Sequence, residues 1–291
     1  MLSSLTRWIK AHELLACIIL TFLISWSAWI YVILTLPELD TKYLGTSGML
    51  LILLGQWGPG LAAVLVAAFA RGRPGLKELF GRLTYRRGSA RWFLAAALLW
   101  TAITLATTLW QARATNQALS FHWNPWSRIF SLLISALPLL FWGCEEIGWR
   151  GFALPRLLDR WNALIASVIL GLVWGAWHLP MFIWNIKGLN TGMPFYTYVV
   201  FTVSISVVMT WLLNHTQGSV LLAIFFHFWI NDYGRFQNAV LPIEDPGGSA
   251  AVMSVWLLAA FAVLIVVFSG YQSFNRHPER SEPAALTTSK A

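Results

Sequence analysis

Two adjacent glutamates and an arginine interrupt an apolar stretch near the middle of the chain. They are Glu145, Glu146 and Arg150. On a helix, Glu146 and Arg150 lie four positions apart with the acid first, which is the favourable order for an ion pair on one face. Glu145 is rotated by about 100° around the helix axis and has no such local partner. The spacing therefore predicts that Glu146 and Arg150 stabilise a site as a pair, and that Glu145 is a candidate general base.

Two histidines in other apolar stretches supply further candidate groups. His227 and Asn231 also lie four positions apart, so on a helix they share a face and offer either oxyanion donors or a ligand with its support. His178 comes shortly before Pro180, which is expected to loosen or end the helix just beyond it. A lone histidine in an aromatic helix is more often a packing residue, so His178 is a candidate only in combination. Glu145, His178 and His227 could together ligate a zinc-like divalent ion or activate water without a metal, and these residues leave both open.

The composition shows what kind of environment surrounds these groups. Of the 291 residues, 57% are hydrophobic and 11% are charged, and the chain has 18 Trp and 18 Phe. An average soluble domain is about 25% charged, so this chain lacks the ionisable side chains of a soluble surface. The composition predicts an integral membrane protein and excludes a soluble enzyme. Ionisable residues inside a membrane are costly, which makes the few that remain functional candidates.

The apolar stretches predict the architecture. A spanning helix needs about 20 mainly apolar residues, and such segments must be helical because their backbone groups find no water in lipid. We expect an all-α, polytopic transmembrane helix bundle of about eight spans, with the site residues on the fourth, fifth and seventh. The expected spans are 14–36, 47–70, 92–111, 129–149, 162–184, 195–213, 217–231 and 250–269.

These spans form one integral membrane domain over 1–270, and 271–291 is expected to be a disordered cytoplasmic tail. Cys17 and Cys144 both lie in apolar runs, so no disulfide framework is expected.

Lysine and arginine residues indicate the orientation. With the amino terminus inside, fifteen of them fall in inner segments and five in outer segments, as the positive-inside rule requires. The sequence therefore predicts that both termini are cytoplasmic, in what we expect to be a bacterial plasma membrane. The net charge of +8 then reflects topology, and no nucleic-acid partner is expected. Between the second and third spans, 75–83 is expected to form a short amphipathic helix on the lipid headgroups.

Depth in the bilayer brings the candidate residues to one level. Counted from the cytoplasmic ends of their spans, Glu145, His178 and His227 lie about 15–24 Å inward, at about 1.5 Å per helical residue. Independent packing residues have no reason to share a plane. Their common depth predicts a polar, water-bearing cavity near the middle of the membrane.

Three motifs, taken in order, resemble those of the CPBP family, also called the ABI family. They are Glu-Glu-x-x-x-Arg at 145–150, aromatic-x-x-x-His-Leu-Pro at 174–180 and His-x-x-x-Asn at 227–231. The family comprises CAAX prenyl endopeptidases and bacteriocin-processing or immunity proteins, which are intramembrane proteases. This chain departs from the usual pattern at Trp174, where the family usually has Phe, and the larger ring puts the wall of the pocket in question.

The resemblance implies roles for these residues. Glu145 would activate the attacking water together with His178, His227 and Asn231 would stabilise the oxyanion, and the acid–arginine pair of the first motif would hold the site. The family is described as metal-dependent by analogy. This chain has no His-Glu-x-x-His motif, so a divalent metal on Glu145, His178 and His227 and a metal-free mechanism are equally compatible with it.

Three functions are consistent with these features. The first is an intramembrane endopeptidase that hydrolyses a membrane-associated protein or peptide. The second is a non-catalytic immunity or peptide-binding protein that uses the same cavity, but a binder has no reason to keep both a base and oxyanion donors. The third is a transporter or proton relay, which is disfavoured because no pair of broken helices occurs in matching halves. The sequence therefore favours the protease and leaves substrate, prenylation, metal and oligomeric state open.

Overall fold

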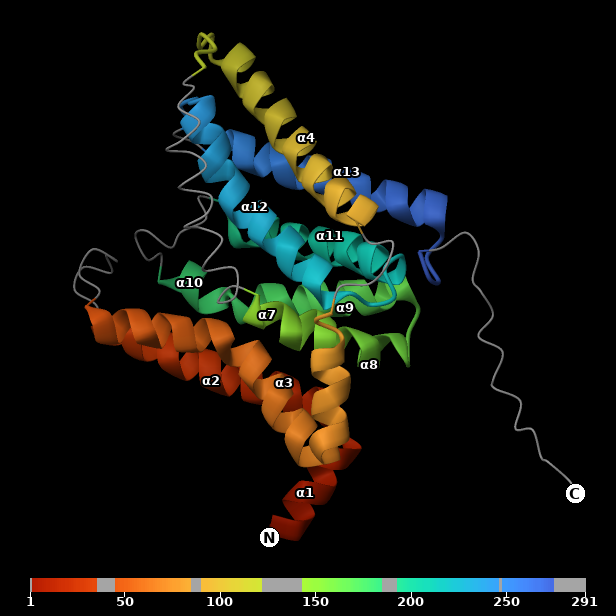
Figure 1. Ribbon diagram of the computed structural model, residues 1–291. Coiled ribbons are helices and arrows are strands. Elements are labelled where there is room, and N and C mark those ends of the chain that lie inside the picture. The colour runs from red at the N-terminus through yellow and green to blue at the C-terminus, as the bar shows by residue number, and fades with distance from the viewer. Residues whose placement is uncertain are drawn as a thin grey trace, which may run out of the picture.

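The described part of the protein is helical throughout. The computed structural model describes residues 2–35, 45–84, 90–121, 143–184, 193–245 and 248–274, and no strand occurs among them (Figure 1). The elements are α1 (Leu2–Ala11), α2 (Glu13–Thr35), α3 (Thr46–Gly81), α4 (Ala90–Ala114), α7 (Cys144–Glu146), η3 (Ile147–Ala153), α8 (Leu154–Leu158), α9 (Ala163–Trp177), α10 (Leu179–Ile183), α11 (Phe195–Asn214), α12 (Val220–Val240) and α13 (Ser249–Ser269).

Five helices of the described chain are long and apolar enough to cross a membrane, namely α2, α3, α4, α11 and α13. They match the predicted spans 14–36, 47–70, 92–111, 195–213 and 250–269. The predicted all-α polytopic membrane bundle is therefore confirmed. The count of eight spans stays a prediction, because most of the expected span 129–149 lies outside the described residues.

Two predicted spans differ from the helices that form. The stretch 162–184 is divided: α9 ends at Trp177, and α10 begins at Leu179 with Pro180 in its first turn. Proline has no N–H and crowds the preceding turn, so the helix already ends before His178. The stretch 217–231 is part of the longer α12, which continues to Val240. The polar residues after 231 end the apolar run but not the helix, which is why hydropathy placed the boundary too early.

The segment with the glutamates and the arginine is not a regular α-helix. One α-helical turn with Glu145 and Glu146 leads into η3, a π-helix of seven residues, and α8 follows it. A π-helix hydrogen-bonds from residue i to i+5, and such bulges occur frequently at functional sites. Assigning this segment to an ordinary helix was therefore wrong in its hydrogen-bonding pattern, although Glu146 and Arg150 still share a face.

Glycines allow α3 to pack directly on α7 and η3. A Cβ on Gly60 would lie 2.4 Å from the Cys144 carbonyl oxygen, and a Cβ on Gly148 would lie 2.4 Å from the Pro59 carbonyl group. Both contacts are with backbone, so neither position has room for a side chain. The two backbones can therefore approach closely at the level of Glu145.

Further along α3, Gly72 has a φ of 63°, and the helix changes direction there (Figure 1). The expected amphipathic segment 75–83 is helical as far as Gly81, in the second part of α3. Its placement on lipid headgroups stays a prediction.

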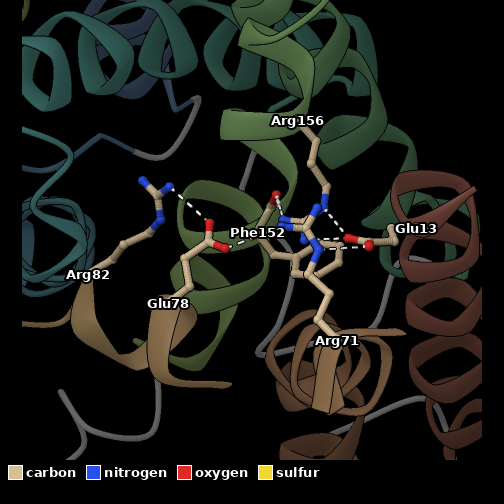
Figure 2. Close-up of polar contacts among 6 residues, drawn as sticks. All are labelled: Glu13, Arg71, Glu78, Arg82, Phe152 and Arg156. Atoms are coloured by element: carbon tan, nitrogen blue, oxygen red, sulfur yellow. Dashed lines mark hydrogen bonds and ion pairs between the residues drawn. The ribbon is translucent and has the colours of Figure 1, made fainter. Parts of the chain in front are cut away.

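An ion-pair network joins α2, α3 and α8 (Figure 2). Glu13 accepts hydrogen bonds from Arg71 at 2.8 Å and from Nε of Arg156 at 2.9 Å. Glu78 lies 3.3 Å from both Arg71 and Arg82. Exposed ion pairs such as those of Glu78 contribute little to stability, about 0–1 kcal/mol each, whereas the side chains of Glu13 and Arg156 are only 12% and 14% exposed. The network therefore mainly fixes the start of α2 relative to its neighbours, at the end of the bundle predicted to be cytoplasmic.

The first residues of the predicted tail pack against the bundle. The backbone N–H groups of Ala163 and Leu164 donate to the carbonyls of Gln272 and Tyr271, and Phe274 is fully buried. Two backbone N–H groups at the N-terminus of α9 therefore have their hydrogen-bond acceptors in the segment that follows α13. The remainder of the expected tail, 275–291, lies outside the described residues.

Candidate active site

Glu145 is buried, with 1% of its surface exposed, and both of its carboxylate oxygens are held. Gln56 on α3 donates from Nε2 to Oε1 at 3.0 Å, and Trp174 on α9 donates from its indole nitrogen to Oε2 at 3.1 Å. The expectation that Glu145 has no partner on its own helix is met. Its partners come from two other helices, and both are neutral donors.

Glu146 lies at the centre of a separate charged cluster. Nη1 of Arg150 lies 2.9 Å from one carboxylate oxygen of Glu146 and 3.0 Å from the other. Nδ1 of His227 lies 2.7 Å from Oε1. Nη2 of Arg150 also donates to the hydroxyl of Ser206 at 3.0 Å. The predicted pair therefore forms, and it extends to α12 and α11.

His227 was expected to act with Asn231, but the contact that the structure shows is with Glu146. A carboxylate only accepts hydrogen bonds, so Nδ1 of His227 carries the proton in this contact. This leaves Nε2 as the ring nitrogen that can face a substrate. The signal for this contact was absent from the sequence because the two residues are 81 positions apart.

His178 lies at the break between α9 and α10. Its Nδ1 is 3.0 Å from the carbonyl oxygen of Trp174, which can only accept, so Nδ1 is again the protonated nitrogen and Nε2 carries the lone pair of the neutral ring. The ring of Tyr198 packs edge-on against His178 with centroids 5.0 Å apart. The helix break therefore gives His178 a fixed tautomer and a fixed orientation.

Trp174 contacts each part of this site. Its ring lies beneath the guanidinium of Arg150, whose Cζ is 4.4 Å from the ring centroid. The ring of His227 meets it edge-on at 5.5 Å, and that of His178 lies 6.1 Å away. The candidate residues of α7, η3, α9 and α12 thus meet around one buried indole.

Asn231 borders a cavity beside the site. The cavity has a volume of about 590 Å³ and is lined by residues of α4, α11, α12 and α13, Tyr198 among them. Asn231 is exposed, and among the described contacts it has no hydrogen bond to His227. Because Tyr198 also packs against His178, the cavity adjoins the site. It is large enough for a short stretch of polypeptide.

Within the described ranges, no three His, Cys, Asp or Glu side chains are close enough together to hold a metal ion. Glu145, His178 and His227 do not form such a group among the described residues, and a divalent metal on them stays a prediction. Both oxygens of Glu145 instead accept N–H donors.

Sequence reasoning missed two polar contacts of the site, Gln56 and Ser206. Both side chains are uncharged, whereas most of the residues predicted from the sequence are charged or titratable. Gln56 did carry a signal, since it is the one amide in the predicted span 47–70. A neutral amide in a membrane span needs a partner for the same reason that a charge does.

Comparisons with known proteins agree with the motifs. A family model described as type II CAAX prenyl endopeptidase Rce1-like matches residues 121–232. A relative named CAAX prenyl protease 2, from Methanococcus maripaludis, is 27% identical over 202 residues, which cover 63% of this chain and 70% of the relative. The matched range contains Glu145, Trp174, His178, His227 and Asn231. Both matches support the assignment of the three motifs to a CAAX-type protease of the CPBP family.

Proposed function

We propose that the protein hydrolyses a peptide bond of a membrane-associated protein or peptide, with Glu145 as the general base. The observation that carries the proposal is the separation of two adjacent carboxylates. Glu146 is neutralised by Arg150 and contacts His227, whereas the hydrogen-bond donors to Glu145 among the described residues are neutral. A carboxylate that is oriented but not paired with a cation retains its basicity for a proton in transfer.

The proposed reaction begins at Glu145. Its carboxylate takes a proton from a water molecule, and the hydroxide attacks the carbonyl carbon of the scissile peptide bond. The lone pair on Nε2 of His178 accepts a hydrogen bond from the same water and orients it. The proton held by Glu145 then passes to the leaving nitrogen as the carbon–nitrogen bond breaks. No step depends on a metal.

The oxyanion is assigned to His227 and Asn231. Two buried carboxylates and one guanidinium leave one negative charge, and a proton on His227 would balance it. With Nδ1–H directed at Glu146, the imidazolium presents Nε2–H to the oxyanion. The amide of Asn231 lies on the cavity wall and is the second donor. Donors fixed in advance at the site of developing charge are usually the largest single contribution to catalysis.

The substrate class follows from the relatives. The matched family model is named for a prenyl endopeptidase and the archaeal relative for a CAAX prenyl protease. We therefore propose a peptide anchored in the bilayer by a lipid chain, whose polypeptide enters the cavity next to Asn231. The alternative of a peptide-binding protein without activity is separated from this proposal by the experiment below.

The test uses the full-length protein in lipid vesicles and an internally quenched peptide that ends in Cys-aliphatic-aliphatic-x, with and without a farnesyl group. The native protein is expected to cleave the farnesylated peptide faster. Glu145→Gln should lower kcat by at least about a hundredfold, the usual contribution of general acid–base catalysis. Glu78→Gln, the same change at a half-exposed acid of the ion-pair network, serves as the control and should leave the rate unchanged.

Each outcome has one meaning. Full activity in both Glu145→Gln and His178→Ala would contradict the catalytic assignment. Equal cleavage of both peptides would contradict the lipid-anchored substrate. Binding of the peptide by the native protein without cleavage would establish the binding protein instead.

A further inference from the structure

Trp174 has a hydrogen-bond donor that the Phe usual at this motif position lacks, and that donor is used. Its indole N–H lies 3.1 Å from Oε2 of Glu145, and the ring is 2% exposed. Gln56 donates to the other oxygen at 3.0 Å. We propose that Trp174 is a positioning residue that fixes the carboxylate of Glu145 through this hydrogen bond. The inference rests on the proposed function, in which Glu145 is the base.

The two donors determine the plane of the carboxylate. A glutamate side chain has three rotatable bonds, and one hydrogen bond leaves the carboxylate free to turn about that contact. Donors from α3 and α9 on opposite oxygens remove this freedom. The lone pairs that remain then point in a fixed direction toward the water. Misplacement by about 1 Å can cost a hundredfold in rate, so orientation of the base matters more than its mere presence.

Trp174 is itself held rigidly, as a positioning residue must be. Its helix packs closely on α11, since a Cβ on Gly171 would lie 2.5 Å from the Cα of Val203. The guanidinium of Arg150 covers one face of the indole at 4.4 Å. Its backbone carbonyl accepts the hydrogen bond of His178. Trp174 therefore contacts Glu145, Arg150 and His178.

Other buried tryptophans show that this hydrogen bond is not a general consequence of burying an indole. Trp149 and Trp177 are 1% and 0% exposed, and within the described structure their indole nitrogens have no hydrogen-bond partner. Packing alone therefore keeps these indoles buried. At Trp174 the donor is directed at Glu145, which unlike Glu146 has no ion-pair partner among the described residues, and this indicates a role beyond filling space.

The experiment removes the donor while keeping the ring. Trp174 is replaced by benzothienylalanine, in which sulfur takes the place of the indole N–H and the bicyclic shape is retained. The same replacement at Trp149, where no hydrogen bond is lost, is the matched control. The farnesylated quenched peptide is the substrate, Glu145→Gln is the reference for loss of the base, and thermal unfolding reports folding.

The expected result is a fall in kcat between about tenfold and about a hundredfold, the factor that corresponds to a hydrogen bond to a charged group. KM should stay within about twofold, because the lost contact acts on the transition state rather than on binding. The unfolding midpoint and the control at Trp149 should match the native protein. Trp174→Phe should show at least the same loss of kcat.

Three results would overturn the inference, and they are distinguishable. Native kcat in the Trp174 variant, with Glu145→Gln inactive, would show that the donor does not position the base. A loss of activity that accompanies a lower unfolding midpoint would show that Trp174 is structural. Full activity of Glu145→Gln would instead overturn the proposed function, and the role of Trp174 with it.

Discussion

Replacing Glu146 with glutamine tests how the two adjacent glutamates divide stability and chemistry. Glu146 and Arg150 are 0% and 1% exposed, and their charged atoms approach to 2.9 Å. Glu146→Gln keeps the shape of the side chain and removes its charge. Arg150 then remains as a buried guanidinium that lies over the Trp174 ring and has the hydroxyl of Ser206 and a neutral amide as described hydrogen-bond partners. We expect this variant to be strongly destabilised.

The magnitude follows from the burial of the pair. Removing one partner of a buried ion pair costs about 3–5 kcal/mol, because an uncompensated charge stays in a medium of low polarity. For a protein of this size such a loss corresponds to a fall in unfolding midpoint on the order of 10 °C. Glu145→Gln should cost only about 1 kcal/mol. Replacing Glu145 leaves no buried cation without its ion-pair partner, and the amide of Gln56 can turn to accept a hydrogen bond from the new NH₂ group.

A double variant isolates the charge from the loss of contacts. Glu146→Gln combined with Arg150→Met removes both charges, and replacement of a whole buried pair by neutral groups is often close to neutral for stability. The double variant should therefore be more stable than Glu146→Gln alone, although both lose activity. The non-additivity measures the coupling between the two residues.

Thermal unfolding of the purified protein in detergent, followed by tryptophan fluorescence, measures these differences. The reasoning is refuted if Glu146→Gln unfolds within about 1 kcal/mol of the native protein, or if Glu145→Gln is the less stable of the two single variants. It is also refuted if the double variant unfolds below Glu146→Gln, since the stranded charge would then not be the cause of the loss.

Three further predictions concern packing, topology and metal. Gly148→Ala should destabilise the protein by about 1–3 kcal/mol, because its Cβ would lie 2.4 Å from the Pro59 backbone. Gly81→Ala should leave stability unchanged, because nothing lies within 4 Å of the new Cβ. The unfolding midpoints of the two variants test this difference. A cysteine at Asn116 should react with a membrane-impermeant maleimide added outside intact cells and one at Lys10 should not, and the reverse labelling would contradict the predicted orientation. Dialysis against a chelator should leave cleavage of the farnesylated peptide unchanged, since no group of three His, Cys, Asp or Glu side chains among the described residues could hold a metal ion. Loss of activity that zinc restores would contradict the metal-free mechanism.

The architecture could be predicted from the sequence where one physical effect dominates. Five apolar stretches became long helices because burial in lipid depends on hydropathy alone. The pairing of Glu146 with Arg150 was predictable because it depends only on helix spacing, and the distortion of that helix into η3 did not separate them. The end of α9 was predictable from Pro180. The continuation of α12 past 231 was not, because it depends on contacts with another helix, such as the hydrogen bond from Gln237 to the Thr104 carbonyl of α4.

Contacts between helices could not be predicted from the sequence. His227 binds Glu146, and no local pattern links residues of α12 and α7. The choice of Asn231 as the partner of His227 relied on spacing within one helix, and spacing shows only that two residues share a face. It does not show which neighbouring helix that face meets. Trp174 was recognised for its size, while its N–H acquires a role only when α9 lies beside α7.

The close packing of α3 explains how Glu145 obtains its second donor. Gly60 admits the Cys144 carbonyl, and Gln56 lies four residues earlier on α3, one turn away on the same face. A side chain at position 60 would push the backbones apart and carry the Gln56 amide out of hydrogen-bond reach of Glu145. The hydrogen bond of Gln56 therefore depends on Gly60, because the glycine allows the short distance between the helices at which the amide reaches Glu145. It follows that a larger residue at 60 should impair catalysis through Glu145 even though it touches no reacting group, which distinguishes this packing contact from those that affect stability alone.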